Sequence, residues 1–239
     1  MTRAELLYAI AAAAANLLGA LTVTTGARWG LRALDLMLAF AAGFLVSVAF
    51  LDLFPEAIRR TGEGAAAVAL VAYLLVHLTQ HTIAKHFHFG EETHPITRVV
   101  GWSALAGLLL HTFVDGVAVA SGTRVSDSLG LLVFVAVVLH KLPEGLAISS
   151  LFLAAGAGKR AALGAAGMLG AATFLGVFLT AHISTLATHG LALSAGVTLY
   201  VGASNLVPEF QAKPGWRLPA SFFAGCAVYA ATRYVANAA

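Results

Sequence analysis

The chain has 239 residues, of which 59% are hydrophobic and only 10% are charged, and its formal net charge is +3. Soluble globular domains carry about 25% charged residues, so this chain cannot cover a surface that faces water. The composition predicts an all-α membrane protein, and it excludes a soluble enzyme. No run of Lys and Arg suggests nucleic-acid binding, and the single Cys226 excludes an internal disulfide.

Hydropathy and helix-breaking residues divide the chain into eight apolar runs. About 20 apolar residues are enough for one membrane-spanning helix. We therefore expect a single transmembrane domain over residues 1–239, with almost nothing left for a soluble part. The first run lacks a small-residue cleavage site, so we expect no cleavable signal peptide. The expected helices lie near residues 6–25, 34–54, 65–84, 99–120, 129–155, 161–186, 192–210 and 216–235.

Basic residues indicate the orientation of these helices. The loops after odd-numbered helices hold eight of them, namely Arg28, Arg32, Lys85, Arg98, Lys159, Arg160, Lys213 and Arg217. The opposite side holds five, namely Arg3, Arg59, Arg60, Arg124 and Arg233. Because basic loops stay in the cytoplasm, we expect both termini outside it.

The second and seventh expected helices end alike, in Asp52-Leu53-Phe54-Pro55-Glu56 and Asn205-Leu206-Val207-Pro208-Glu209. These two helices run in opposite directions in the expected topology, as the fourth and fifth do. This pattern is typical of an inverted repeat, in which the substrate site lies near the membrane midplane between the halves. The expected fold is a pseudo-symmetric inverted-repeat bundle of eight transmembrane helices.

The fourth and fifth helices each carry an imidazole and a carboxylate four residues apart. His111 precedes Asp115, and His140 precedes Glu144, inside long apolar runs. Residues i and i+4 share one face of a helix, so two facing helices would bring four ligands to one point. Neutral His and ionised carboxylates are the ligands of divalent transition metals, typically Zn²⁺. The spacing predicts a metal site inside the membrane.

A purely structural explanation is also available for these residues. Asp115 and Glu144 would then be counter-ions of Lys141, and the two histidines would be hydrogen-bonded in the core. Ionisable side chains in membrane spans are expensive and are functional by default. Two matched His and carboxylate pairs on neighbouring helices favour the metal.

His111 to Gly116 and His140 to Gly145 resemble the fourth- and fifth-helix motifs of the ZIP (Zrt/Irt-like) metal-ion transporters, bacterial type. The runs Gly43 to Glu56 and Tyr200 to Glu209 are similar to the second and seventh helices of that family. The resemblance implies eight helices, a binuclear site and transport of divalent cations into the cytoplasm. It also implies that the protein lies in a bacterial inner membrane. It assigns the first metal site to His111, Asp115, His140 and Glu144.

Three positions depart from the family pattern and fall on its second metal site. Thr112 stands where the family often has Asn, Lys141 where it often has a carboxylate, and Thr173 where the sixth helix commonly has a carboxylate. An ammonium repels a divalent ion strongly in a poorly screened interior. Our hypothesis is that Lys141 takes the place of the second cation, which leaves one metal ion per site.

Other polar residues mark a path for the ion. Asp52 and Glu56 at the outer end of the second helix are entrance candidates, although a solvated cap explains them equally well. The exit candidates are Asp35, Ser204, Asn205 and Glu209. The histidines of the third helix and of the cytoplasmic loop after it are candidates for receiving or sensing metal, with a solvated loop as the alternative; they are His77, His81, His86, His88 and His94.

The function that these residues favour is import of divalent metal, most often zinc, with Fe, Mn, Co, Ni and Cd left open by the mixed ligands. The metal is substrate and no cofactor is expected. The expected partners are metal ions and lipid, and the small residues within the spans leave a homodimer open. The alternative is an intramembrane zinc-dependent hydrolase with Glu56 or Glu209 as general base, and a metal sensor is a third class.

Overall fold

The computed structural model describes residues 1–26, 31–80, 98–211 and 213–238. These residues form helices and connecting turns, with no strand among them. The helices are α1 (Arg3–Thr24), α2 (Leu31–Val48), α3 (Phe54–Thr61), α4 (Gly64–Leu78), α5 (Arg98–Val125), α6 (Asp127–Ala154), α7 (Gly158–His182), α8 (Ser184–Leu199), α9 (Val207–Gln211) and α10 (Arg217–Ala238), and the π-helical segments include η1 (Ala49–Leu53) and η3 (Tyr200–Leu206).

Six helical spans in the described part are long and apolar enough to cross a membrane: 3–24, 32–61, 101–125, 127–154, 158–182 and 184–206. Helix α4 is a shorter apolar helix of 15 residues. The expectation of an all-α membrane protein is confirmed. The second span continues to Thr61, seven residues beyond the end expected from the sequence, because Pro55 lies in the first turn of α3 and does not stop the helix.

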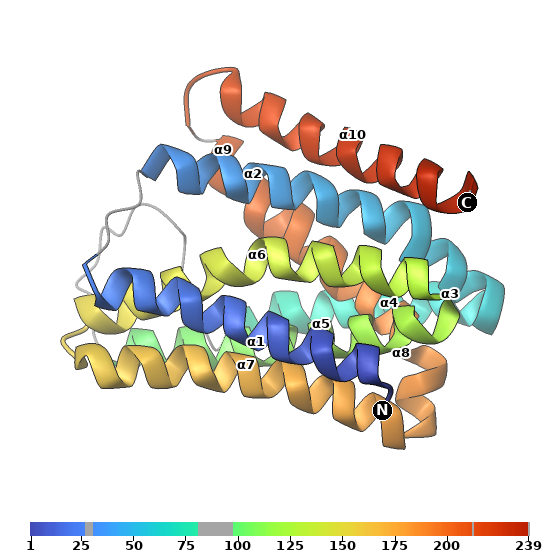
Figure 1. The fold of residues 1–239 in the computed structure, drawn as a ribbon, viewed down its shortest axis with the longest axis horizontal. Helices are drawn as coiled ribbons and strands as arrows, with labels where there is room; N and C mark the ends of the chain where they lie inside the picture. The colour runs from blue at the N-terminus through green and yellow to red at the C-terminus, as the bar shows by residue number, and fades with distance from the viewer. Residues whose placement is uncertain (27–30, 81–97, 212, 239) are drawn as a thin grey trace.

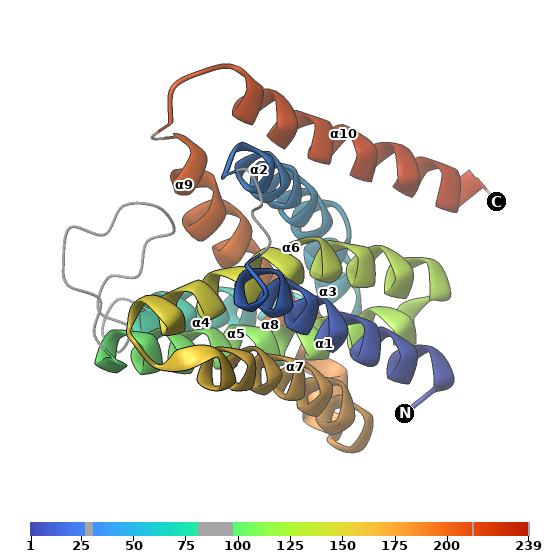
Figure 2. The same ribbon diagram turned by 60° about the vertical axis from the view of Figure 1, so that its left-hand side comes forward.

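The helices form two groups (Figures 1 and 2). Helices α1, α5, α6 and α7 pack against one another, whereas α2 packs along α10 and α4 packs along α8. The groups meet where α5 contacts α8 and where α6 contacts α2. The start of α1 and the end of α10 lie at the same end of the bundle (Figures 1 and 2), as an even number of crossings requires.

Glycines bring the helices of the first group into backbone contact. A Cβ at Gly19 of α1 would collide with α6, and a Cβ at Gly145 of α6 would collide with α1. The same reciprocal relation joins Gly116 of α5 to Gly176 of α7. Small residues let helices approach closely in lipid, where van der Waals contact is the main source of association. The contact between α1 and α6 is therefore equivalent to the contact between α7 and α5.

The second group repeats this relation. Gly43 and Gly225 bring α2 and α10 into contact, and Gly196 brings α8 against the backbone of α4 at Ala69. The contact between α2 and α10 is thus equivalent to the contact between α8 and α4. Both pairs of contacts are explained if α1, α2, α4 and α5 of the first half correspond to α7, α8, α10 and α6 of the second half. This correspondence is the arrangement of an inverted repeat.

The two π-helical segments also correspond. Segment η1 precedes Pro55 and η3 precedes Pro208, in the two motifs that echo each other in the sequence. A proline has no N–H to donate to the carbonyl four residues earlier, and the helix widens where that bond is missing. Segment η1 packs on α8 and η3 packs on α2. Irregular backbone therefore lies inside both halves of the bundle.

Candidate metal centre

The metal candidates come from the middle of α5 and α6, two helices that pack against each other. His111 and Asp115 lie one turn apart on α5, and His140 and Glu144 one turn apart on α6. All four are buried, with 3–4% of their surface exposed. One ligand atom from each lies within 4.8 Å of the others. The geometry that the i, i+4 spacing predicts is present.

The distances in this cluster are close to those of a zinc site. Asp115 Oδ2 lies 3.2 Å from His140 Nε2 and 3.3 Å from His111 Nε2, and His111 Nε2 lies 3.9 Å from Glu144 Oε1. Ligands bonded at about 2.0–2.1 Å in a tetrahedron lie roughly 3.3–3.4 Å from one another. Asp115 Oδ2 has this separation from each of the two imidazole nitrogens, whereas Glu144 Oε1 lies farther from His111 Nε2.

The two imidazoles have different surroundings. His140 Nδ1 lies 3.0 Å from the carbonyl oxygen of Ala136, one turn earlier on α6. When Nδ1 carries the proton and donates to this carbonyl, the lone pair of Nε2 points toward Asp115, which is the tautomer a metal requires. Neither ring nitrogen of His111 makes a hydrogen bond within the described part of the chain. The contacts of His111 Nε2 are with the carboxylates of Asp115 and Glu144, which a bound cation would also contact.

Lys141 is fully buried in the same cluster. Its Nζ donates to Glu144 Oε2 at 2.6 Å and to Thr112 Oγ1 at 3.0 Å, and it lies 2.7 Å from Asp115 Oδ2. Thr112 in turn donates to Glu144 Oε1 at 2.6 Å. The ammonium thus pairs with both carboxylates of the candidate site, as the structural explanation of the sequence also expects.

Thr173 lies at the edge of this cluster. Its backbone carbonyl faces Gly116, the residue after Asp115, so α7 passes close to the ligands of α5. The Thr173 hydroxyl donates to the carbonyl of Leu169 in its own helix at 3.3 Å, and the side chain is fully buried. Of the three second-site candidates, Thr112 and Lys141 contact ligand side chains, whereas Thr173 hydrogen-bonds its own backbone.

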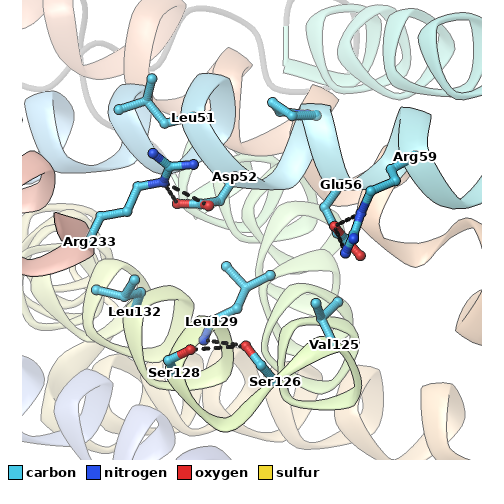
Figure 3. A pocket seen from close by; sticks show the side chains of 11 residues that line it. Leu51, Asp52, Glu56, Arg59, Val125, Ser126, Ser128, Leu129, Leu132 and Arg233 are labelled. Atoms are coloured by element: carbon cyan, nitrogen blue, oxygen red, sulfur yellow. Dashed lines mark hydrogen bonds and ion pairs between the residues drawn. The ribbon is translucent and has the colours of Figure 1, made fainter. Parts of the chain in front are cut away.

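The two entrance candidates line one cavity of about 250 Å³ (Figure 3). It lies between η1, α3, α10 and the turn from α5 to α6. Asp52 accepts hydrogen bonds from the Tyr229 hydroxyl and from Arg233 Nε, the latter at 3.0 Å. Glu56 is paired with Arg59 and Arg60 of its own helix, at 2.5 and 2.6 Å. Both carboxylates are held by arginines in this structure.

The exit candidates are divided between two places. Asp35 pairs with Lys213 at 2.7 Å in a cavity between the start of α2 and the start of α10. In η3, Ser204 hydrogen-bonds Tyr73 at 2.5 Å and Asn205 donates to Gln80 at 2.9 Å. Glu209 belongs to α9, and its side chain lies outside the described part. Ser204 and Asn205 therefore tie η3 to the α4 side of the bundle.

Of the histidine candidates beyond the cluster, the structure describes His77. Its ring stands edge-on to Tyr200 of η3, with 5.9 Å between ring centres. His81, His86, His88 and His94 lie outside the described residues.

Several polar residues escaped the sequence reasoning. Tyr229 and Arg233 hold Asp52 from α10, far away in sequence. Asn16, Ser121 and Ser194 are buried, and their side chains have no hydrogen-bond partner within the described ranges. A sequence signal existed for Asn16, because it is a single amide inside an alanine- and leucine-rich membrane span, where polar groups are rare.

Comparison with known proteins identifies the family of the chain. The family model "ZIP Zinc transporter" matches residues 78–232, more than half of the chain, including the whole cluster. The chain is 26% identical over 218 residues to "Zinc transporter ZIP13" of Pongo abelii, covering 84% of this chain and 65% of that relative. It is 35% identical over 156 residues to "Zinc transporter ZIP9" of Micropogonias undulatus, covering 59% of this chain and 49% of that relative.

A third relative, "Zinc transporter SLC39A7" of Rattus norvegicus, is 32% identical over 142 residues, covering 59% of this chain and 26% of that relative. The chain thus spans less than two thirds of each of these three relatives. The family match rests on the half of the chain that supplies both His and carboxylate pairs. The chain therefore belongs to the ZIP zinc transporter family.

Proposed function

We propose that this chain carries divalent metal cations, zinc first, across a membrane through the site formed by His111, Asp115, His140 and Glu144. The observation that carries the proposal is the convergence of these four buried side chains, with ligand atoms within 4.8 Å of one another, inside two apolar helices. Buried ionisable groups in a membrane span are costly, and a cation pathway explains their presence. The names of the relatives, all zinc transporters, support the choice of zinc.

The charge pattern supports an orientation of the chain in the membrane. The excess of basic residues in the odd loops supports cytoplasmic odd loops and outer termini. An ion would then enter near Asp52 and Glu56 and leave past η3. The cluster opens to one side at a time when the group of α1, α5, α6 and α7 moves against the other helices, within one domain over residues 1–239. The resemblance to bacterial members favours a bacterial inner membrane.

One metal ion occupies the site in this proposal, because the Lys141 ammonium sits between the carboxylates that a second ion would need. Lys141→Asp replaces this cation by a further carboxylate and should raise the zinc stoichiometry from one to two per chain. Equilibrium dialysis of the purified variant measures the ratio. A ratio that stays at one would contradict the role given to Lys141.

The hydrolase alternative needs a free general base beside the ligands. Glu56 is bound to two arginines in the end cavity, which removes one of its two candidates. No described contact favours hydrolysis over transport.

The transport proposal is tested by zinc uptake into vesicles that contain the purified protein. Saturable uptake above that of protein-free vesicles is the expected result. Competition by Mn, Fe, Co, Ni and Cd salts then ranks the cations that the mixed nitrogen and oxygen ligands accept. Uptake equal to that of protein-free vesicles would contradict the proposal.

A further inference from the structure

Lys141 needs new hydrogen-bond acceptors when a metal ion enters the site. In the metal-free arrangement its ammonium uses Asp115, Glu144 and Thr112. A divalent ion held by Asp115 Oδ2 and Glu144 Oε1 takes the Asp115 oxygen that the ammonium contacts, and its charge repels the ammonium from the Glu144 carboxylate. A buried ammonium that loses its acceptors is strongly unfavourable, since it is then neither hydrated nor paired.

Asn16 of α1 is an acceptor without a donor. Its residue surface is 0% exposed, and neither Oδ1 nor Nδ2 has a hydrogen-bond partner among the described residues. An unsatisfied amide in an apolar interior costs free energy, and an apolar side chain of the same size would avoid that cost. We therefore expect the Asn16 amide to be hydrogen-bonded in another state of the protein.

The position of Asn16 points to Lys141. The backbone of Asn16 lies against Gly145, where a Cβ would collide with its carbonyl. Gly145 follows the ligand Glu144 directly and lies four residues after Lys141, so Gly145 and Lys141 share one face of α6. Side chains on a helix lean toward its N-terminus, and α1 and α6 run in the same direction (Figure 1), so the Asn16 amide extends toward the level of Lys141.

The inverted repeat independently supports a role for Asn16 at the transport site. Asn16 and Gly19 contact α6 as Thr173 and Gly176 contact α5, with the same spacing of three residues. Asn16 is thus the counterpart of Thr173, which lies against the residue after Asp115. Helices α1 and α7 flank the paired ligands, and each places one buried polar side chain beside them. The side chain on α1, Asn16, has no hydrogen-bond partner among the described residues.

We infer that Asn16 belongs to the transport site and that its amide oxygen accepts a hydrogen bond from Lys141 when a metal ion occupies the carboxylates. Asn16 is a positioning residue that acts through Lys141. It stabilises the loaded state by giving the displaced ammonium an acceptor, and so it raises metal affinity without touching the ion. The inference rests on the proposed function only in that a metal binds at the four ligands.

The test is Asn16→Leu, which keeps the number and branching of the side-chain heavy atoms and removes the amide. Zinc titration in detergent should show affinity weakened about tenfold, the size expected for one hydrogen bond to a charged group. The metal-free variant should melt at the same temperature as the native protein or higher, because an unsatisfied group is gone. Ser194→Ala, which removes an unsatisfied hydroxyl from α8, should leave zinc affinity unchanged.

The same substitution in a Lys141→Met background isolates the mechanism. Zinc affinity should then change less than about twofold, because the coupling partner is missing. Equal weakening in both backgrounds, or a lower melting temperature without weaker zinc binding, would overturn the inference. A native protein that binds zinc but carries no zinc across vesicles would refute the transport proposal and leave this binding result standing.

Discussion

Lys141 lies between the two carboxylates that a metal ion needs, at 2.6 and 2.7 Å. In the empty site it is an internal counter-ion, which lets two carboxylates stay ionised inside the membrane. In the proposed loaded site it would compete with the ion. Binding would then be weaker than four ligands alone would give, which suits a carrier that must release its ion.

Lys141→Met separates these effects. Two buried carboxylates lose their cation, so the metal-free variant should lose about 3–5 kcal/mol of stability. Zinc affinity should rise roughly tenfold or more, because zinc no longer displaces an ammonium. Thermal unfolding with zinc and with chelator measures both. Lys159→Met, at an exposed position of α7, is the control; a metal-free Lys141→Met protein as stable as native would contradict this account.

The ligands themselves were predictable from the sequence, because i, i+4 spacing fixes one face of a helix whatever the tertiary structure. The partners of Lys141 and the unsatisfied amide of Asn16 were not, since they depend on how α1, α5 and α6 are placed. Asp52 shows the same limit. Its partners Tyr229 and Arg233 lie at the far end of the chain, and no local pattern joins them.

At the scale of helices, the site depends on backbone contact. Gly145 and Gly116 each follow a ligand carboxylate, and each lets a helix of the same group lie against it. A side chain at either glycine would push α1 or α7 away and shift the ligand beside it. The glycines therefore link packing to ligand geometry.

Gly145→Ala should lower stability by about 1–3 kcal/mol, the usual cost of overpacking, and weaken zinc binding. Gly164→Ala in α7 is the matched control, because nothing lies within 4 Å of its added methyl group. It should stabilise the helix by about 0.5–1 kcal/mol. Thermal unfolding of both purified variants measures this, and equal stabilities would contradict the packing argument.

Hydropathy predicted apolar helices, but it did not predict their irregularities or all of their ends; α8 begins at Ser184 and not near residue 192. Pro55 and Pro208 predict missing backbone bonds, yet whether a helix stops, kinks or widens depends on its neighbours. Here both helices widen into η1 and η3 and continue. The second span is therefore longer than its apolar run.

At the scale of the molecule, ion pairs close both ends of the bundle. Arg233 and Tyr229 join α10 to η1 at one end, and Lys213 joins Asp35 of α2 at the other. Both entrance candidates are thus paired with arginines, and the proposed cation entry at this end would require these ion pairs to open.

Arg233→Gln should remove the cation paired with Asp52, which keeps its hydrogen bond from Tyr229, and lower the KM for zinc uptake by roughly twofold or more at low ionic strength, because an anion without a counter-ion attracts cations. The effect should shrink as salt rises. Arg3→Gln, which removes an exposed charge at the same end, should change KM less. Zinc uptake over a concentration series decides this, and a KM unchanged by Arg233→Gln would remove Asp52 from the path.

The most direct test of the account is zinc uptake by vesicles holding His111→Ala or Glu144→Ala protein. Saturable uptake should fall to the level of protein-free vesicles in both variants. His182→Ala and Glu63→Ala remove the same side chains outside the cluster and should keep native uptake. Native uptake in either cluster variant would contradict a transport path through the paired residues of α5 and α6.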